Sequence, residues 1–285
     1  MVNKTKKEHT RVVIIGGGFA GIELVKKLRR APVQVTLIDR NNYFTFQPLL
    51  YQVAMGGLEP SSVSYPYRTM FRGMKNVKFK MANVDAIDYK NKLVNTNIGD
   101  EPYDFLVIAT GSKPNFFGLD DEHLLSLKTI PQAREIRNWM LKKLEQANVT
   151  AGKQAQKNLL NIVIVGGGPT GVELAGALGE LKKIILPKDF PDLDPKLMEI
   201  HIVEGKDQVL GGMSKYAGEN AASYLESLGV RVHLSTRVNQ FENGIVKIGE
   251  EEIIADQIIW TAGVAGNTPD GIESKLMKNG RVQVN

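Results

Sequence analysis

Two glycine-rich segments carry the residue types and spacing that best fit a definite chemistry. Residues 11–24 read RVVIIGGGFAGIEL and residues 161–174 read NIVIVGGGPTGVEL, so one pattern recurs at an offset of 161 − 11 = 150 residues. In a G-x-G-x-x-G segment the first glycine permits a tight turn, the second lets a pyrophosphate approach the backbone, and the third lets a helix pack close to a strand. The glycines are Gly16, Gly18 and Gly21 in the first copy and Gly166, Gly168 and Gly171 in the second.

A glycine-rich turn without a ligand is the simpler interpretation of one such motif. Both copies here stand between a β-branched run and a helical pattern, which makes that interpretation much weaker. We therefore predict two dinucleotide sites, each with phosphates at a helix N-terminus, where unpaired N–H groups and the helix dipole favour negative charge. The residues between the second and third glycines belong to these predicted sites, namely Phe19 and Ala20 in the first copy and Pro169 and Thr170 in the second.

An acidic residue ends the strand that follows each motif. Asp39 comes 39 − 21 = 18 residues after Gly21, close to the ~20 expected for a carboxylate that hydrogen-bonds a ribose hydroxyl. The alternative for Asp39 is an ordinary surface carboxylate at a strand end. Glu204 comes 204 − 171 = 33 residues after Gly171, and the proline-broken segment 185–197 accounts for the extra length. A carboxylate there would repel a 2′-phosphate, which favours NADH over NADPH.

Parallel strands and helices must position these residues, and the remaining patterns supply them. Short strands over 77–108 predict a β-meander followed by a buried strand, and residues 112–130 resemble a linker. The sequence therefore predicts an α/β fold with two Rossmann-like dinucleotide-binding domains, each with a small antiparallel β-meander. Apolar periodicity predicts helices over about 19–30, 131–148, 169–186 and 215–228.

Composition excludes several other classes of function. The 285 residues hold no cysteine, so a disulfide relay, a thiolate zinc site and a Cys-x-x-Cys redox pair are all excluded. The 4 histidines show no ligand spacing, and no metal site is expected. The net charge of +5 suits anionic cofactors or an anionic membrane face, although a solvated basic surface is the simpler interpretation. No nucleic-acid module is recognisable.

The sequence resembles a known family at several of these places. The paired glycine motifs and the small-residue turns after two buried strands are similar to those of the flavin-dependent pyridine nucleotide-disulfide oxidoreductases. Within that superfamily, DRNNYFTFQPLLYQVAMGGL (39–58) and VGGGPTGVELAGAL (165–178) resemble the type II NADH dehydrogenases, which are single-subunit NADH:quinone oxidoreductases of respiratory chains. The resemblance covers essentially all of residues 10–285.

The resemblance implies an arrangement of domains. Residues 1–118 would form the FAD-binding domain and residues 119–264 an NADH-binding domain inserted in it. Residues 265–285 would begin the return of the chain to the FAD domain. Each domain would bind its cofactor at one glycine motif.

The resemblance also implies site residues. Gln47, near the flavin, and Glu173, facing the nicotinamide, would be the catalytic residues. The plain alternative for Glu173 is a charge that complements the helix dipole, as Glu23 would in the first copy. FAD would be bound by Gly16, Gly18, Phe19, Ala20, Gly21, Asp39, Arg40, Gln47, Val84, Ala109, Thr110 and Gly111, and NADH by Gly166, Gly168, Pro169, Thr170, Gly171, Glu173, Glu204 and Gly263.

Two departures from the family pattern bear on the electron acceptor. The family usually has histidine where this chain has Phe44. Family members also continue beyond the position of Asn285 into a Gly-Asp pair on FAD, a quinone site and amphipathic helices. Those helices would hold a cytoplasmic protein peripherally on the inner face of a membrane. We expect this chain to lack them and to be soluble, and a homodimer is left open.

Three functions remain open from the sequence. The first is an FAD-dependent NADH:quinone oxidoreductase. The second is another cysteine-free flavin reductase that passes electrons to ferredoxin, a soluble quinone or oxygen. The third is an inactive NADH-binding remnant without flavin.

Overall fold

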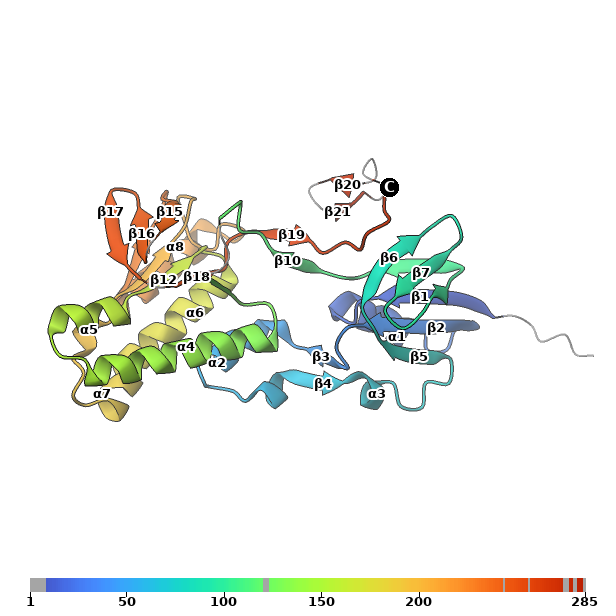
Figure 1. Ribbon diagram of the computed structural model, residues 1–285, viewed down its shortest axis with the longest axis horizontal. Helices are drawn as coiled ribbons and strands as arrows, with labels where there is room; N and C mark the ends of the chain where they lie inside the picture. The colour runs from blue at the N-terminus through green and yellow to red at the C-terminus, as the bar shows by residue number, and fades with distance from the viewer. Residues whose placement is uncertain are drawn as a thin grey trace, which may run out of the picture. The chain divides into compact units, whose positions relative to one another are not determined.

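The chain folds into two compact units. In this computed structural model, the described residues are 9–119, 123–242, 244–255, 257–273, 277–278 and 281–283. Unit 1 comprises Met1–Thr45, Ser64–Lys113 and Ala265–Asn285, and unit 2 comprises Phe46–Val63 and Pro114–Val264. Unit 1 is built from three stretches of the chain and unit 2 from two, which can be followed by colour in Figure 1.

Unit 1 is organised around a parallel sheet with the strand order β5-β2-β1-β9. Its side chains alternate between two apolar faces, so both faces must be covered. Val12 and Ile14 point to the face packed against helix α1, and Val13 and Ile15 point to the opposite face. The elements are β1 (Thr10–Ile15), α1 (Phe19–Leu28), β2 (Val33–Asp39), β5 (Val77–Met81) and β9 (Phe105–Ile108).

The second face of this sheet is covered by an antiparallel meander. Ile87, Val94 and Tyr103 of the meander segment pack on the face that carries Val13 and Ile15. The remaining elements of unit 1 are β3 (Tyr43–Thr45), β4 (Ser64–Pro66), α3 (Tyr67–Met70), β6 (Val84–Asp88), β7 (Leu93–Thr96), β8 (Glu101–Pro102), β20 (Met277–Lys278) and β21 (Arg281–Val282).

Strand β5 differs from the expectation for residues 77–108. We expected it to begin the meander, but it pairs in parallel with β2, from Val35 opposite Val77 to Asp39 opposite Met81. The reason is that Val77 and Phe79 pack on the core beneath α1, which an antiparallel meander strand on the other face does not reach.

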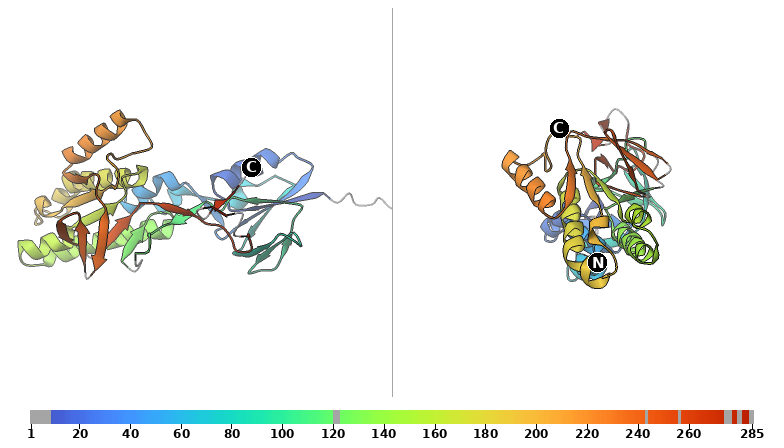
Figure 2. Two further views of the ribbon diagram at one scale, coloured as in Figure 1. Left: turned by 90° about the horizontal axis from the view of Figure 1, so that it is seen from above. Right: turned by 90° about the vertical axis from the view of Figure 1, so that its left-hand side faces the viewer.

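Unit 2 repeats this three-layer plan with one more strand. Its parallel sheet has the order β11-β18-β12-β13-β14. Ile162 and Ile164 face the helices, and Val163 and Val165 face a second meander. The elements are β11 (Leu124–Ser126), α4 (Ile130–Val149), β12 (Ile162–Val165), α6 (Pro169–Glu180), β13 (Ile200–Val203), α8 (Lys215–Ser227), β14 (Val230–His233), β15 (Val238–Glu242), β16 (Ile245–Ile248), β17 (Glu251–Ile254) and β18 (Ile258–Trp260), most of them visible in Figures 1 and 2.

Two segments of unit 2 differ from the sequence expectations. Residues 124–126, expected in a linker, form β11, which pairs in parallel with β18 and has all three side chains buried. Residues 46–63 lie in the range expected for the first domain, but Leu50, Val53 and Val63 are buried in the main core of unit 2. Their apolar side chains therefore pack with α4 and α6 of that unit.

The helix expected over 169–186 is interrupted. A π-helical turn follows α6, and a proline stands near the start of the next short helix, where it supplies no backbone N–H. The other elements are η1 (Gln47–Leu49), α2 (Leu50–Ala54), η2 (Pro60–Val63), α5 (Lys153–Leu160), η3 (Leu181–Ile185), α7 (Leu186–Asp189) and η4 (Pro195–Leu197), together with the paired strands β10 (Ser112–Pro114) and β19 (Val264–Gly266).

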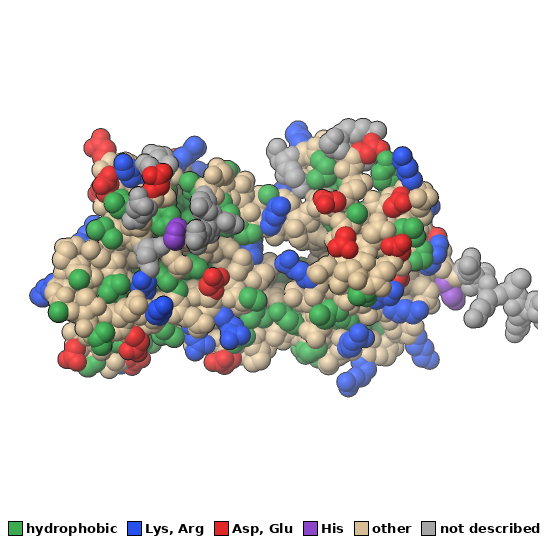
Figure 3. Space-filling model, viewed as in Figure 1, with side chains coloured by type: hydrophobic (Ala, Val, Ile, Leu, Met, Phe, Trp, Pro, Cys, Tyr) green, Lys and Arg blue, Asp and Glu red, His purple; other side chains and the backbone are tan. Residues whose placement is uncertain are grey.

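Across the described ranges, no helix combines the length and apolar character that crossing a bilayer requires. On the face shown in Figure 3, basic and acidic side chains are interspersed on each unit.

A buried histidine lies within the sheet of unit 2. His201 on β13 is 1% exposed, and its Nδ1 lies 3.1 Å from Nε2 of His233 on β14. Burial, reinforced by His233 and Arg231, lowers the pKa of His201 from 6.5 to about 4. Glu199 lies 3.7 Å from His201 Nε2 but is also paired with Arg231 and Lys157. His201 is therefore neutral in the folded chain at neutral pH.

The stability of unit 2 should fall as the pH decreases from 6.5 towards 4. In this window the unfolded chain binds a proton at His201 and the folded chain does not, because its pKa is lowered from 6.5 to about 4. The contribution of this one residue to the free energy of unfolding falls by at most roughly 3 kcal/mol across the window. The measurement is the denaturant midpoint against pH for the wild type and His201→Leu. Equal pH dependence in both proteins would remove His201 as the cause.

Candidate functional site: two glycine loops at strand ends

The first glycine loop connects β1 to α1 in unit 1. Gly16 has φ +100, and a Cβ on it would lie 2.4 Å from the Ala109 carbonyl oxygen at the end of β9. A Cβ on Gly21 would lie 2.0 Å from the Gly16 carbonyl oxygen, so this glycine is needed for the helix to start close to the strand. A Cβ on Gly18 would meet nothing within 4 Å, which leaves open space beside the backbone.

The second loop, between β12 and α6 of unit 2, has the same geometry. Gly166 has φ +111, and a Cβ on it would lie 2.6 Å from the Ala262 amide nitrogen. A Cβ on Gly171 would lie 1.9 Å from the Gly166 carbonyl oxygen, whereas one on Gly168 would meet nothing within 4 Å. The first and third glycines of both motifs therefore serve the fold, and the second leaves space that a ligand could occupy.

Neither helix that follows a loop has a side-chain N-cap. Gly18 and Gly168 are the N-cap residues, and neither has a side chain to accept a hydrogen bond from the first turn. The first intrahelical bonds are Ile22 N–H to the Gly18 carbonyl and Val172 N–H to the Gly168 carbonyl, both at 3.0 Å. Both helix starts are therefore suited to an external anion. Phe19, Ala20, Pro169 and Thr170 occupy these first turns.

The two predicted ribose carboxylates lie directly beside the loops. Asp39 accepts hydrogen bonds from the Gly17 N–H at 2.7 Å and the Asn41 N–H at 2.8 Å. Glu204 accepts them from the Gly167 N–H at 2.7 Å and the Lys206 N–H at 2.9 Å. Each carboxylate oxygen keeps a free lone pair, so both groups could accept a ribose hydroxyl as well.

Tyr67, the first residue of α3, contacts the first glycine loop in a way that the sequence did not reveal. Its hydroxyl donates to the Gly17 carbonyl at 2.8 Å, and burial together with the nearby Asp39 raises its pKa. In unit 2 the equivalent carbonyl, on Gly167, accepts from the Leu210 N–H at 2.7 Å. A tyrosine that follows a proline at the start of a short helix carries no pattern that would have identified this role.

The two repeated glutamates have different surroundings. Each is the fifth residue of its helix, which lies beyond the first turn where we expected it to complement the helix dipole. Glu23 is paired with Lys26 at 2.7 Å, which lowers its pKa, whereas burial raises the pKa of Glu173. The position 150 residues after Lys26 is Gly176, so Glu173 has no equivalent cation.

The other predicted residues are distributed over both units. In unit 1, Val84 begins β6, while Ala109 and Thr110 follow β9. Gly111 has φ +69, and its carbonyl accepts from the Asn267 N–H at 3.2 Å. Arg40 directly follows β2.

In unit 2, Gln47 is exposed, and its amide donates to the Lys128 carbonyl at 3.4 Å. Gly263 has φ +70, and a Cβ on it would lie 2.7 Å from the Phe117 ring. The roles of Gln47, Glu173 and Gly263 in cofactor binding stay predictions.

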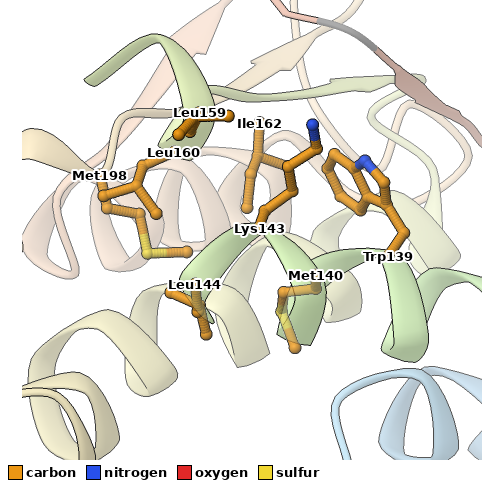
Figure 4. A pocket seen from close by; sticks show the side chains of 8 residues that line it. All are labelled: Trp139, Met140, Lys143, Leu144, Leu159, Leu160, Ile162 and Met198. Carbon is orange, nitrogen blue, oxygen red and sulfur yellow. The ribbon is translucent and has the colours of Figure 1, made fainter. Parts of the chain in front are cut away.

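An apolar pocket lies between α4, α5 and β12, where Lys143 lies beside Trp139 and the other lining residues are leucine, isoleucine and methionine (Figure 4). It contains none of the predicted site residues. No cluster of three or more histidine or carboxylate side chains among the residues placed by the structure could hold a metal ion.

Comparison with known proteins identifies the family. The family model described as pyridine nucleotide-disulphide oxidoreductase matches residues 10–285. The chain belongs to this family. The type II NADH:quinone oxidoreductase of Staphylococcus aureus is 30% identical over 97% of the chain and 70% of its own length, and the chain belongs with these type II enzymes. Type II NADH:quinone oxidoreductase Ndh of Mycobacterium tuberculosis is 33% identical over 96% of the chain and 63% of its own length.

A solved structure confirms the α/β fold with two Rossmann-like cores. NDH2 from Plasmodium falciparum in complex with NADH superimposes with a TM-score of 0.85 at 24% identity, covering 91% of this chain and 56% of that one. The present chain therefore spans little more than half of the length of the Plasmodium protein.

Substitutions at two glycines of the unit 2 motif should affect different properties, one NADH binding and the other stability. Gly168→Ala should leave the fold intact and weaken NADH binding, because its methyl group would enter the open space at φ −73 without strain. Gly171→Ala should destabilise unit 2 by ~1–3 kcal/mol, since its Cβ must displace the Gly166 carbonyl. Thermal unfolding and calorimetric titration measure the two effects. Unchanged NADH affinity in Gly168→Ala would contradict the proposed phosphate position.

Tyr67→Phe should loosen the first loop without affecting the second. The variant keeps the buried ring but loses the hydroxyl that donates to the Gly17 carbonyl, at a cost of ~1 kcal/mol. We expect faster flavin release and a lower unfolding midpoint of unit 1, with NADH affinity of unit 2 unchanged. Tyr65→Phe is the matched control, because Tyr65 is 47% exposed. Equal flavin retention in both variants would show that the Tyr67 hydroxyl does not support the loop.

Proposed function

We propose that this chain is the dinucleotide-binding part of a type II NADH:quinone oxidoreductase, in which unit 1 binds FAD and unit 2 binds NADH. One observation carries the proposal, namely two glycine loops with the same two features. Each has open space at the second glycine of its motif, Gly18 or Gly168. In each, a carboxylate also accepts a hydrogen bond from the middle glycine of the Gly-Gly-Gly run, Gly17 or Gly167. A dinucleotide needs both features, because the pyrophosphate approaches the backbone and the ribose meets an acid.

The residues present fit these two cofactors. In unit 1, the first turn of α1 would take the FAD pyrophosphate and Asp39 the ribose. In unit 2, the first turn of α6 would take the NADH pyrophosphate and Glu204 the ribose. The open space at Gly18 and Gly168 is what a close approach of phosphate to backbone requires.

FAD bound in unit 1 would supply the redox chemistry that links NADH to a quinone. The chain itself contributes binding and orientation. Glu173, whose pKa is raised by burial, and Gln47 are the side chains we propose beside the reacting groups. The absence of cysteine from the sequence means that no disulfide in this chain can carry the electrons.

The proposal of a quinone as the acceptor comes from the named activity of the relatives. Both the Mycobacterium tuberculosis and the Staphylococcus aureus proteins are named NADH:quinone oxidoreductases. Since the quinones of respiratory chains are lipid-soluble, we propose a cytoplasmic protein that works at the inner face of a membrane. Association as a homodimer is compatible with this role.

The visible absorption spectrum of the purified chain tests the proposal. We expect the bands of an oxidised flavin, and we expect them to bleach when NADH is added without oxygen. A water-soluble quinone should then restore the bands faster than ferredoxin does. A protein that stays colourless when FAD is supplied would overturn the assignment of FAD to unit 1, and restoration by ferredoxin alone would overturn the assignment of the acceptor.

A further inference from the structure

The backbone around the strand-end acid is hydrogen-bonded in an equivalent way in both units. The Ala82 N–H donates to the backbone carbonyl of Asp39 at 2.9 Å, and the Thr236 N–H donates to that of Glu204 at 3.0 Å. Two residues later, Val84 and Val238 begin the two meanders. Both meanders also have a register shift directly after this valine, between Val84 and Ala86 and after Val238. The two segments are therefore structurally equivalent.

This equivalence pairs Arg237 with Asn83, the residues just before the two valines. It also pairs the residues just after the acids, Arg40 in unit 1 and Gly205 in unit 2. Unit 1 therefore has an arginine after the acid and a neutral residue on the neighbouring segment. Unit 2 has the reverse, with no side chain after the acid and an arginine on the neighbouring segment.

The Arg237 side chain lies against the backbone of Gly205, the residue that follows Glu204. A Cβ on Gly205 would lie 3.4 Å from both Cγ and Nε of Arg237. The Ser235 N–H donates to the Lys206 carbonyl at 2.7 Å, so the segment before Arg237 is tied to the loop after Glu204. Arg237 is exposed and forms no ion pair with any acid placed by the structure. Its charge is therefore available to a ligand at the end of β13.

We infer that Arg237 contacts the adenosine end of the coenzyme in unit 2 and offsets the exclusion of a 2′-phosphate by Glu204. The inference rests on the proposed binding of NADH to unit 2 and adds a residue that sets its specificity. Arg237 would supply, from the neighbouring segment, a guanidinium that in unit 1 directly follows the acid in the sequence, on Arg40.

The chemistry of the guanidinium supports both parts of this role. A planar guanidinium stacks on an aromatic face and keeps its charge at all physiological pH values. Beside a ribose it also attracts a 2′-phosphate, as an arginine does in NADP sites. Glu204 repels the same phosphate. Discrimination between the two coenzymes then depends on the balance of Glu204 and Arg237, with Lys206 adding a second cation in the same loop.

Calorimetric titration with NAD⁺ and NADP⁺ tests the inference on the full chain supplied with FAD. Arg237→Gln should weaken NAD⁺ binding roughly 3- to 30-fold. Glu204→Gln should strengthen NADP⁺ binding roughly 10-fold or more, and adding Arg237→Gln should abolish that gain. Arg237→Lys keeps the charge, so it should retain more of the NADP⁺ affinity than of the stacking-dependent NAD⁺ affinity.

Arg134→Gln is the matched control, because it removes another exposed arginine of unit 2, on α4. It should leave both affinities unchanged, and thermal unfolding shows that each variant is folded. If the wild type binds NAD⁺ and folded Arg237→Gln binds it equally well, the inference fails while the proposed function stands. A wild type that binds neither nucleotide overturns the proposed function and the inference with it.

Discussion

One hydrogen bond recurs at the glycine loop of both units, and the candidate sites depend on it. The carboxylate at the end of the second strand accepts the N–H of the middle glycine, at 2.7 Å for Asp39 with Gly17 and at 2.7 Å for Glu204 with Gly167. A hydrogen bond to a charged group contributes ~1.5–3 kcal/mol. It joins the end of one strand to the loop after its neighbour, so the loop holds its shape with the following helix start open. The same acid remains able to accept a ribose hydroxyl.

The two units share this hydrogen bond but differ in the groups that contact the rest of the loop and the following helix. The middle glycine carbonyl is held by the Tyr67 hydroxyl in unit 1 and by the Leu210 N–H in unit 2. The repeated glutamate is neutralised by Lys26 in unit 1, whereas Glu173 of unit 2 lacks such a partner. A loop whose backbone geometry is specified can accept any neighbour that satisfies its polar groups. Differences of this kind adapt one fold to two ligands.

Much of the fold could be predicted because it depends on local patterns. Both glycine motifs, their acids and the main helices lie where the sequence placed them, and the structure brings each acid to its loop. Strands β5 and β11 are assigned wrongly from the sequence, since a strand of three to five residues is too short for its pattern to show which sheet it joins. Residues 46–63 also pack in unit 2, because burial of Leu50 and Val53 depends on α4 and α6.

The sequence by itself determined which backbone positions must be glycine and which strand ends carry an acid. Those features depend on steric limits and spacing along the chain, which are local properties. Only the tertiary structure decided which distant side chains complete each loop. Tyr67 reaches Gly17 across 50 residues, and Arg237 lies over Gly205 because two backbone segments pair. Such contacts are set by sheet order and register, which no local pattern encodes.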